Sequence, residues 1–227
     1  MAGGRVFVLR PEPGLAATME RGLAMGLPME AMPLSRAQPV AWTMPDRAYD
    51  GILLGSANGL RHAGEGLAKL THLPAYAVGR ATASAAQAHG FDVAQTGTGG
   101  LQPLVDRLPP DRLLSLLRLA GAEHLPLSAP AHIAIDTVVT YEIVHRALDE
   151  DAVGRLARGG VVLLHSGAAA EHFAGECARV GLDRSQLALA ALAPRIVTSV
   201  SEGWKSVKVA ASPDDAALLS LAADMWH

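Results

Sequence analysis

Short apolar runs alternate with segments of helical periodicity along most of the chain, and this alternation is typical of an α/β protein. The run RVFVLR at 5–10 predicts a buried strand, and the Ala-, Leu- and Met-rich segment 15–26 predicts an amphipathic helix. Further strands are expected at 29–34, 51–55, 75–78, 92–94, 114–119, 161–165, 188–192 and 207–210. Further helices are expected at 58–69, 80–89, 101–108, 149–158, 168–180, 195–202 and 213–225. Ser212 is the expected N-cap of the last helix, followed by Pro213 at its first position.

Two segments interrupt this series. The segment 35–48 contains Pro39, Pro45 and several polar residues, which predicts an extended linker. The segment 131–145 alternates apolar and polar residues, as in IAIDTVVTYEIV, and this predicts an extended ribbon. The chain is therefore expected to cross twice between two bodies.

The first β-α-β unit is too small to bury its own sheet, so we expect it to pair with the C-terminal third of the chain. The predicted fold is α/β, with two similar lobes that have parallel sheets, a two-stranded ribbon hinge between them, and a cleft. The predicted boundaries are 1–36 with 147–227 for one lobe, 46–132 for the inserted lobe, and 37–45 and 133–146 for the ribbon linkers.

A strand-to-helix pattern occurs twice, as GILLGSANG at 51–59 and GVVLLHSGA at 160–168. Each copy places a serine where a buried strand meets a helix, and free N–H groups at a helix N-terminus favour an anion. A polycarboxylate or phosphate site is therefore one interpretation; simple helix capping is the other. A similar turn, GRAT, occurs at 79–82. The candidate binding residues are Ser56, Asn58, Gly79, Arg80, Thr82, Ser166 and Gly167.

Composition excludes several classes of function. The chain has 227 residues, a net charge of −3 and no basic block, so we expect no nucleic-acid partner. No apolar run approaches the roughly 20 residues of a membrane span, so we expect no membrane partner. The single cysteine, Cys177, excludes an intrachain disulfide and fits a reducing cytoplasm. Its position among Ala and Val on a predicted helix indicates a buried, inert thiol.

Other motifs indicate neither a metal nor a nucleotide. The nine histidines are scattered, and the spacing of His165 and His172 matches no known set of metal ligands. TGTGG at 96–100 lacks the Lys-Ser/Thr of a phosphate-binding loop, so a polar loop at a lobe edge is favoured. Tyr141 in the ribbon has two open interpretations: it donates a proton or hydrogen bond to a ligand, or it packs against a lobe.

Taken in order, several segments resemble the bacterial uroporphyrinogen-III synthase family. They are LRPEPG at 9–14, DGILLGSANGL at 50–60, PAYAVGRATA at 74–83, LRLAG at 117–121, VVTYE at 138–142 and LLHSGAAAEHF at 163–173. The resemblance implies a cyclising lyase that needs no cofactor and makes a tetrapyrrole. Its implied substrate is hydroxymethylbilane, a linear tetrapyrrole with eight carboxylates, supplied by hydroxymethylbilane synthase. It also implies a cytoplasmic monomer.

By the same resemblance, the enzyme expels the terminal hydroxyl and closes the ring with inversion of the last pyrrole through a spiro intermediate. Tyr141 is then the candidate that assists hydroxyl departure, and Arg10 and Gly121 join the candidate substrate contacts. The chain departs from the family at 193–197, where APRIV replaces a Gly followed by Thr-Ala, and Arg195 stands in for a hydroxyl donor. The alternative function is a two-lobed binding or sensor module for an anionic small molecule, without turnover.

Overall fold

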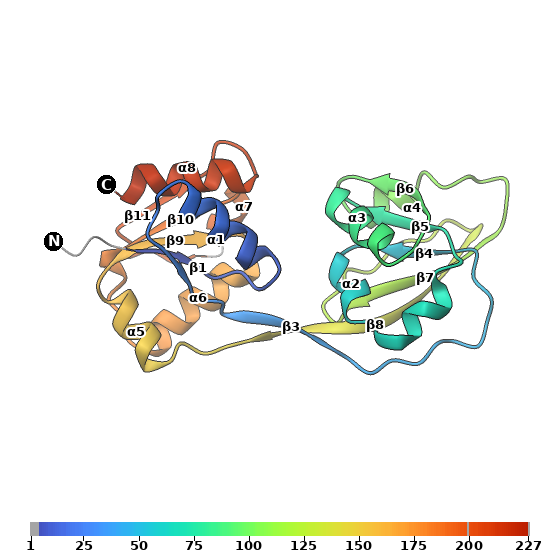
Figure 1. Ribbon diagram of the computed structural model, residues 1–227, viewed down its shortest axis with the longest axis horizontal. Helices are drawn as coiled ribbons and strands as arrows, with labels where there is room; N and C mark the ends of the chain where they lie inside the picture. Colours follow the sequence, from blue (N-terminus) through green and yellow to red (C-terminus); the bar gives the residue numbers. More distant parts are fainter. Residues whose placement is uncertain (1–4, 199, 227) are drawn as a thin grey trace. The chain divides into compact units, whose positions relative to one another are not determined.

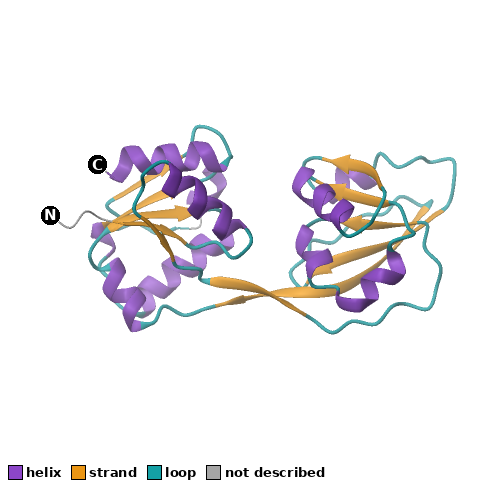
Figure 2. Ribbon diagram, in the orientation of Figure 1, coloured by secondary structure: helices purple, strands orange, loops and turns teal. Residues whose placement is uncertain are grey.

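The computed structural model describes residues 5–198 and 200–226. Contacts between Cα atoms divide the chain into two units (Figure 1). Unit 1 contains the residues up to Arg36 and from Val144 onward, and unit 2 contains Ala37–Ile143. Both units combine a sheet with helices on its two faces (Figure 2).

Unit 1 is built on a sheet with the strand order β11-β10-β9-β1-β2, in which every recorded pair is parallel. Its strands are β1 (Arg5–Val8), β2 (Met29–Ala31), β9 (Gly160–Leu164), β10 (Leu187–Ala191) and β11 (Ser206–Val209). Its helices are α1 (Gly14–Ala24), α5 (Glu150–Leu156), α6 (Gly167–Arg179), α7 (Pro194–Val197), α8 (Asp215–Trp226) and the 3-10 turn η2 (Arg184–Gln186).

Alternate residues of β1 face two separate cores in this unit. Phe7 packs in a core with Leu156 of α5 and Phe173 of α6, whereas Val8 packs with Leu219 of α8. Because both faces of the sheet are covered, its central strands are apolar throughout, which is why the sequence shows continuous apolar runs rather than alternation.

Unit 2 has the strand order β3-β8-β7-β4-β5-β6. Its strands are β3 (Ser35–Pro39), β4 (Gly51–Leu54), β5 (Ala75–Val78), β6 (Val93–Gly97), β7 (Leu114–Gly121) and β8 (Ile133–His145). Its helices are α2 (Ala57–Arg61), α3 (Arg80–Ala88), α4 (Leu101–Val105) and the 3-10 helix η1 (Gly64–Leu70). One face of the sheet packs on α2, η1 and α3, and the other packs on α4. The pairs from β6 to β8 are parallel, so the predicted α/β class with two parallel sheets is confirmed.

Strands β3 and β8 carry the chain between the two units and are neighbours in one sheet (Figure 1). The Val40 N–H donates to the Thr140 carbonyl at 3.0 Å, and Gln38 Nε2 donates to Glu142 Oε1 at 2.7 Å. The predicted two-stranded connection is therefore present. The predicted domain boundaries remain a prediction about folding.

Several predicted helices differ from the structure, and three of the differences have an identified local cause. The expected helix 58–69 is divided into α2 and η1, and Gly64, the first residue of η1, has φ +63°, a left-handed conformation that interrupts a continuous α-helix. The expected helix 195–202 is only α7, which ends at Val197. Thr198 is its C-cap, and Thr198 Oγ1 donates a hydrogen bond to the Arg195 carbonyl at 2.8 Å. Residue 199 of that expected helix lies outside the described residues.

The third difference is the start of the last helix. Helix α8 begins at Asp215, because Asp214 Oδ1 accepts a hydrogen bond from the Ala217 N–H at 2.9 Å. Asp214 is therefore the N-cap, and the prediction of Ser212 in that position is wrong.

Candidate functional site

In unit 2 the candidate residues lie where parallel strands end. Ser56 follows β4, Gly79 follows β5, and Gly121 ends β7. Since the carboxyl ends of parallel strands meet at one edge of a sheet, these positions share an edge, which is where α/β proteins commonly bind ligands.

Ser56 caps helix α2 in extended conformation, and its Oγ accepts a hydrogen bond from the Asn58 N–H at 3.2 Å. The side chain of Asn58 accepts from Arg61 Nη1 at 3.1 Å. The capping interpretation of Ser56 is thus confirmed. Its hydroxyl hydrogen is still available to donate, because a hydroxyl can accept and donate at once.

The turn before α3 leaves the N-terminus of that helix without a side-chain cap. Gly79 occupies the N-cap position with φ +78°, a backbone conformation that a side chain would strain. Arg80 is exposed in the first turn, whereas Thr82 is buried with 6% exposure. The Gly79 N–H already donates to the Gly97 carbonyl at 2.9 Å, so Arg80 is the exposed side-chain donor of this turn.

A cavity of about 160 Å³ in unit 2 brings together three of the predicted site residues: Ser56, Gly121 and Tyr141. The Tyr141 ring lies directly against Gly121, because a Cβ atom at position 121 would be 2.7 Å from Tyr141 Cζ. The His62 ring lies on Tyr141 with a centroid distance of 6.0 Å. Gly121 therefore gives the tyrosine ring its space, and both Tyr141 and Ser56 line the cavity.

The same cavity contains Arg118, which was not among the site residues predicted from the sequence. Arg118 is only 7% exposed, and its Nη1 donates to the Leu125 carbonyl at 2.8 Å. The available signal was a single charge within the apolar strand LSLLRLAG at 114–121.

In unit 1, Ser166 and Gly167 form the start of α6. Ser166 Oγ accepts from the Ala169 N–H at 3.2 Å, so this serine also acts as an N-cap, and Gly167 is the first helical residue. The helix runs for 13 residues, and its dipole favours an anion at this end.

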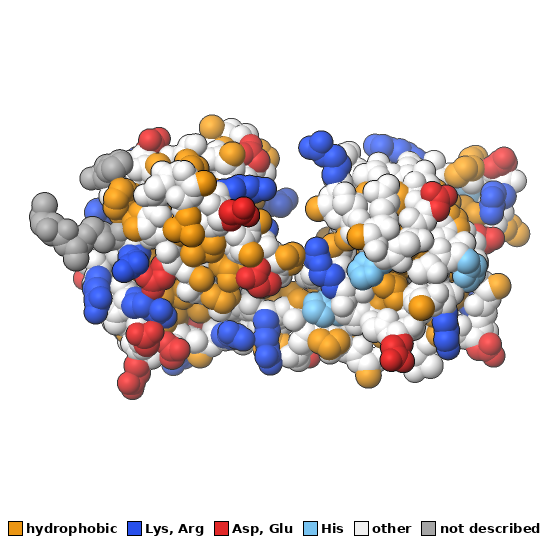
Figure 3. All heavy atoms as spheres, in the orientation of Figure 1, with side chains coloured by type: hydrophobic (Ala, Val, Ile, Leu, Met, Phe, Trp, Pro, Cys, Tyr) orange, Lys and Arg blue, Asp and Glu red, His pale blue; other side chains and the backbone are white. Residues whose placement is uncertain are grey.

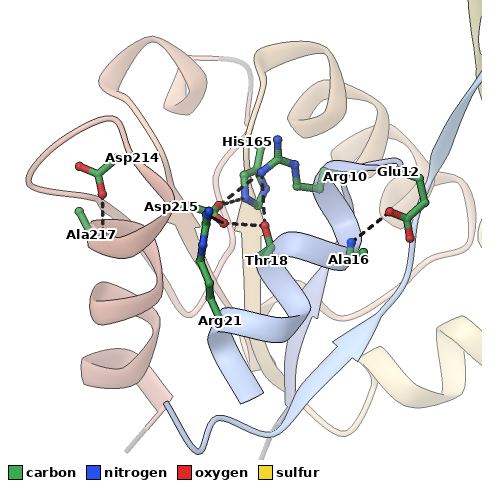
Figure 4. A network of polar contacts seen from close by, with 9 residues as sticks. All are labelled: Arg10, Glu12, Ala16, Thr18, Arg21, His165, Asp214, Asp215 and Ala217. Atoms are coloured by element: carbon green, nitrogen blue, oxygen red, sulfur yellow. Dashed lines mark hydrogen bonds and ion pairs between the residues drawn. The ribbon is translucent and has the colours of Figure 1, made fainter. Parts of the chain in front are cut away.

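Arg10 belongs to a polar network centred on Asp215 (Figure 4). Arg10 Nη1 lies 3.4 Å from Asp215 Oδ1, and the other oxygen of Asp215 accepts from Thr18 Oγ1 at 2.8 Å and from Arg21 Nη1 at 3.1 Å. His165 Nε2 donates to Asp215 Oδ1 at 3.0 Å. Arg10 is thus already paired with a carboxylate of its own unit.

Burial decides the charge of this network. Burial, with Arg10 nearby, lowers the pKa of His165 despite its bond to Asp215, so the imidazole is neutral at pH 7. Burial acts to raise the pKa of Asp215, but hydrogen bonds from Thr18 and His165 and the charge of Arg10 outweigh it and hold that pKa below its usual range. Two arginines facing one aspartate leave a net positive charge at this place.

Within residues 5–198 and 200–226, no group of three His, Cys, Asp or Glu side chains is arranged to hold a metal ion. Over the same residues, no helix has the length and apolar character needed to cross a membrane. Acidic and basic side chains are interspersed on the face shown in Figure 3.

The parallel sheets, the helix N-termini at their strand ends and the polar cavity beside Tyr141 define a two-unit α/β protein suited to an anionic small molecule. A family model described as uroporphyrinogen-III synthase HemD matches residues 26–220. The chain belongs to the uroporphyrinogen-III synthase family.

Solved structures agree in fold. Uroporphyrinogen-III synthetase from Helicobacter pylori is similar with a TM-score of 0.68 and 16% identity, covering 98% of this chain and 99% of that one. A mutant uroporphyrinogen III synthase from Thermus thermophilus is similar with a TM-score of 0.56 and 16% identity, covering 98% of each chain. Comparison with curated proteins gives no match. The prediction of a cyclising lyase of tetrapyrrole biosynthesis is confirmed by the family, and nothing favours a binding module without turnover.

Proposed function

We propose that the chain cyclises hydroxymethylbilane to uroporphyrinogen III and uses the cavity beside Tyr141 for the step in which hydroxide leaves. The observation that carries this proposal is the cavity itself, which gathers Tyr141, Ser56 and Gly121 from three separate elements at the carboxyl edge of the sheet. The family match supports the reaction, and within this proposal the Tyr141 hydroxyl is the proton donor.

The proposed reaction needs only one proton donor, which is regenerated at the end. The terminal C–O bond of the substrate breaks, and the Tyr141 hydroxyl donates its proton to the departing hydroxide, which leaves as water. The substituted carbon of the last pyrrole then attacks the resulting azafulvene cation, and the spiro intermediate opens and recloses with that ring inverted. The proton released when the pyrrole regains aromaticity returns to the phenolate, so the enzyme is regenerated without a cofactor.

Substrate carboxylates would be held by several weak donors rather than by one clamp. The supporting observations are the uncapped N-terminus of α3 beside Arg80 and the N-terminus of α6 at Ser166 and Gly167. Arg10, in its positively charged network, is a further contact, and Asn58 and Thr82 complete the proposed set. Such contacts fix the conformation of a flexible tetrapyrrole, and positioning of this kind can lower much of the activation barrier to ring closure.

We also propose that the enzyme is a cytoplasmic monomer that receives its substrate from hydroxymethylbilane synthase. The family supports the substrate. A buried free thiol at Cys177 is compatible with a reducing compartment. Sedimentation of the purified chain tests the oligomeric state, and co-sedimentation with hydroxymethylbilane synthase tests a direct transfer.

The test of the reaction is isomer analysis of the porphyrinogen that forms when the protein is coupled to a source of hydroxymethylbilane. We expect the type III isomer, with type I as the product of the source alone. Type I as the sole product in the presence of the folded protein would reject the proposed function.

A further inference from the structure

Arg118 places a guanidinium inside the sheet of unit 2. In β7 it pairs with Leu53 of β4 on one side and with Thr137 of β8 on the other. Leu53 and Leu116 belong to the apolar core under α4, and alternation along β7 puts Arg118 on the same face as Leu116. The fold therefore holds a charged group at the carboxyl end of an otherwise apolar face.

Among the described residues, this charge has no counter-charge. The ion pairs of the described residues do not include Arg118. Its Nη1 donates to a neutral carbonyl, that of Leu125, and its Nε is buried without a partner. Glu123 lines the same cavity but is exposed and forms no ion pair with it. Burial lowers the pKa of Arg118, with Tyr141 opposing this, yet an arginine remains charged in proteins.

An unpaired buried charge is costly to the folded state, since desolvation is not offset by attraction. The backbone of β7 forms its ladder whatever side chain stands at 118, so the strand itself does not require a charge there. A carboxylate entering the cavity would supply the missing partner through charge-assisted hydrogen bonds.

We propose that Arg118 binds one carboxylate of the substrate inside the Tyr141 cavity and so places the reacting end of the tetrapyrrole against the phenol hydroxyl. This inference rests on the proposed function and names the cation of that site. The contact forms in the ground state and persists in the transition state, so it acts mainly on substrate affinity.

The test compares Arg118→Met with Arg112→Met. Methionine keeps much of the length of the side chain and removes the charge. Arg112 is an exposed arginine of the same unit, 3.6 Å from Asp50, and it serves as the matched control. We expect Arg118→Met to raise KM about 10- to 100-fold, as the loss of a hydrogen bond between charged groups does, with kcat changed only a few-fold. We expect Arg112→Met to leave both constants unchanged.

Thermal unfolding separates binding from a structural role. Because Arg118→Met removes an unpaired buried charge, its melting temperature should equal or exceed that of the wild type. Arg118→Lys, which keeps the charge without the planar fork, should recover part of the KM loss. An unchanged KM overturns the inference, whether or not the melting temperature falls.

A binding measurement tests the role of Arg118 without relying on turnover. Uroporphyrin, a stable octacarboxylate, is titrated into wild type, Arg118→Met and Arg112→Met and followed by its fluorescence. We expect Arg118→Met alone to weaken binding by about tenfold or more. Absence of the type III isomer with wild-type protein rejects the proposed function, whereas normal turnover with equal affinities in all three proteins rejects only the role of Arg118.

Discussion

Neighbouring residues on β8 occupy different environments, and the difference decides which of them can take part in chemistry. Thr140 is buried, and its Oγ1 donates to the Gly59 carbonyl at 3.0 Å, which ties the strand to helix α2. Tyr141, the next residue, lines the cavity. One hydroxyl thus contributes to the fold, and the neighbouring side chain lines the cavity.

Tyr141→Phe should lower the rate of type III product formation about 10- to 100-fold, at the low end of general acid catalysis, because positioning by the carboxylate contacts remains. The measurement is kcat for formation of isomer III by the variant and the wild type, after their melting temperatures have been shown to match. Wild-type kcat in this variant would remove the phenol from the mechanism.

Tyr49→Phe is the control for that variant. Tyr49 donates to Asp136 Oδ2 at 2.6 Å, and burial together with this hydrogen bond raises the pKa of Tyr49 to about 12. It lies outside the residues that line the Tyr141 cavity. Tyr49→Phe should therefore reduce stability and leave turnover at the wild-type rate.

Some residue-level features follow from sequence and others do not. The burial of the Cys177 thiol was predicted from its apolar helical neighbours and is confirmed, and this burial raises its pKa to about 12. The partner of Arg10 could not be predicted, because Asp215 lies 205 positions away in the chain. Arg118 was missed for a different reason. A lone charge in an apolar strand indicates a binding role only when the cavity around it is known.

At the scale of elements, helix α6 is hydrogen-bonded to the segment that precedes α5, at Leu148. Glu176 Oε2 accepts from the Leu148 N–H at 2.7 Å, and both oxygens of Glu176 accept from Arg179. The hydrogen bond from Arg179 is the main reason that the pKa of Glu176 falls to about 2, against an opposing effect of burial. The carboxylate form is thus favoured by folding.

A depressed pKa stabilises the fold above the pKa of the unfolded chain, 4.5, and this stability is lost as the pH falls through about 2. Glu176→Gln should therefore lower the melting temperature at pH 7, by about 2–4 °C for each kcal/mol lost. The difference from wild type should shrink as the pH falls from 5 to 3. Glu171→Gln, an exposed change on the same helix, is the control. A difference that is constant with pH would show that the charge of Glu176 does not contribute.

Strand positions were easier to predict than helix ends, and the reason is physical. A strand buried on both faces is a continuous apolar run, as GVVLL in β9 shows. A helix end depends on one or two residues, such as Gly64 with its positive φ or Asp214 with its capping carboxylate. Several residues near an end can compete for these roles, so sequence alone does not choose among them.

At the scale of the whole molecule, each unit has its own apolar interior. Leu189 of β10 is fully buried in unit 1, and Leu53 of β4 is fully buried in unit 2. The first unit is assembled from both ends of the chain, so its core joins residues such as Phe7 and Leu189 that are far apart in sequence. This division was predicted from the small size of the first β-α-β unit, because so small a unit needs a partner to bury its sheet.

If the two units are separate folding domains, a cavity in one core should leave the other intact. Leu189→Ala and Leu53→Ala should each cost about 2–5 kcal/mol, since each removes a fully buried leucine side chain. Hydrogen exchange should then accelerate in β9 and β10 for the first variant and in β4 and β7 for the second, with the other unit unchanged. Calorimetry should resolve two transitions, of which each variant lowers one. If each variant instead accelerates exchange throughout the chain, the two units unfold as a single cooperative structure, and the predicted domain division is wrong.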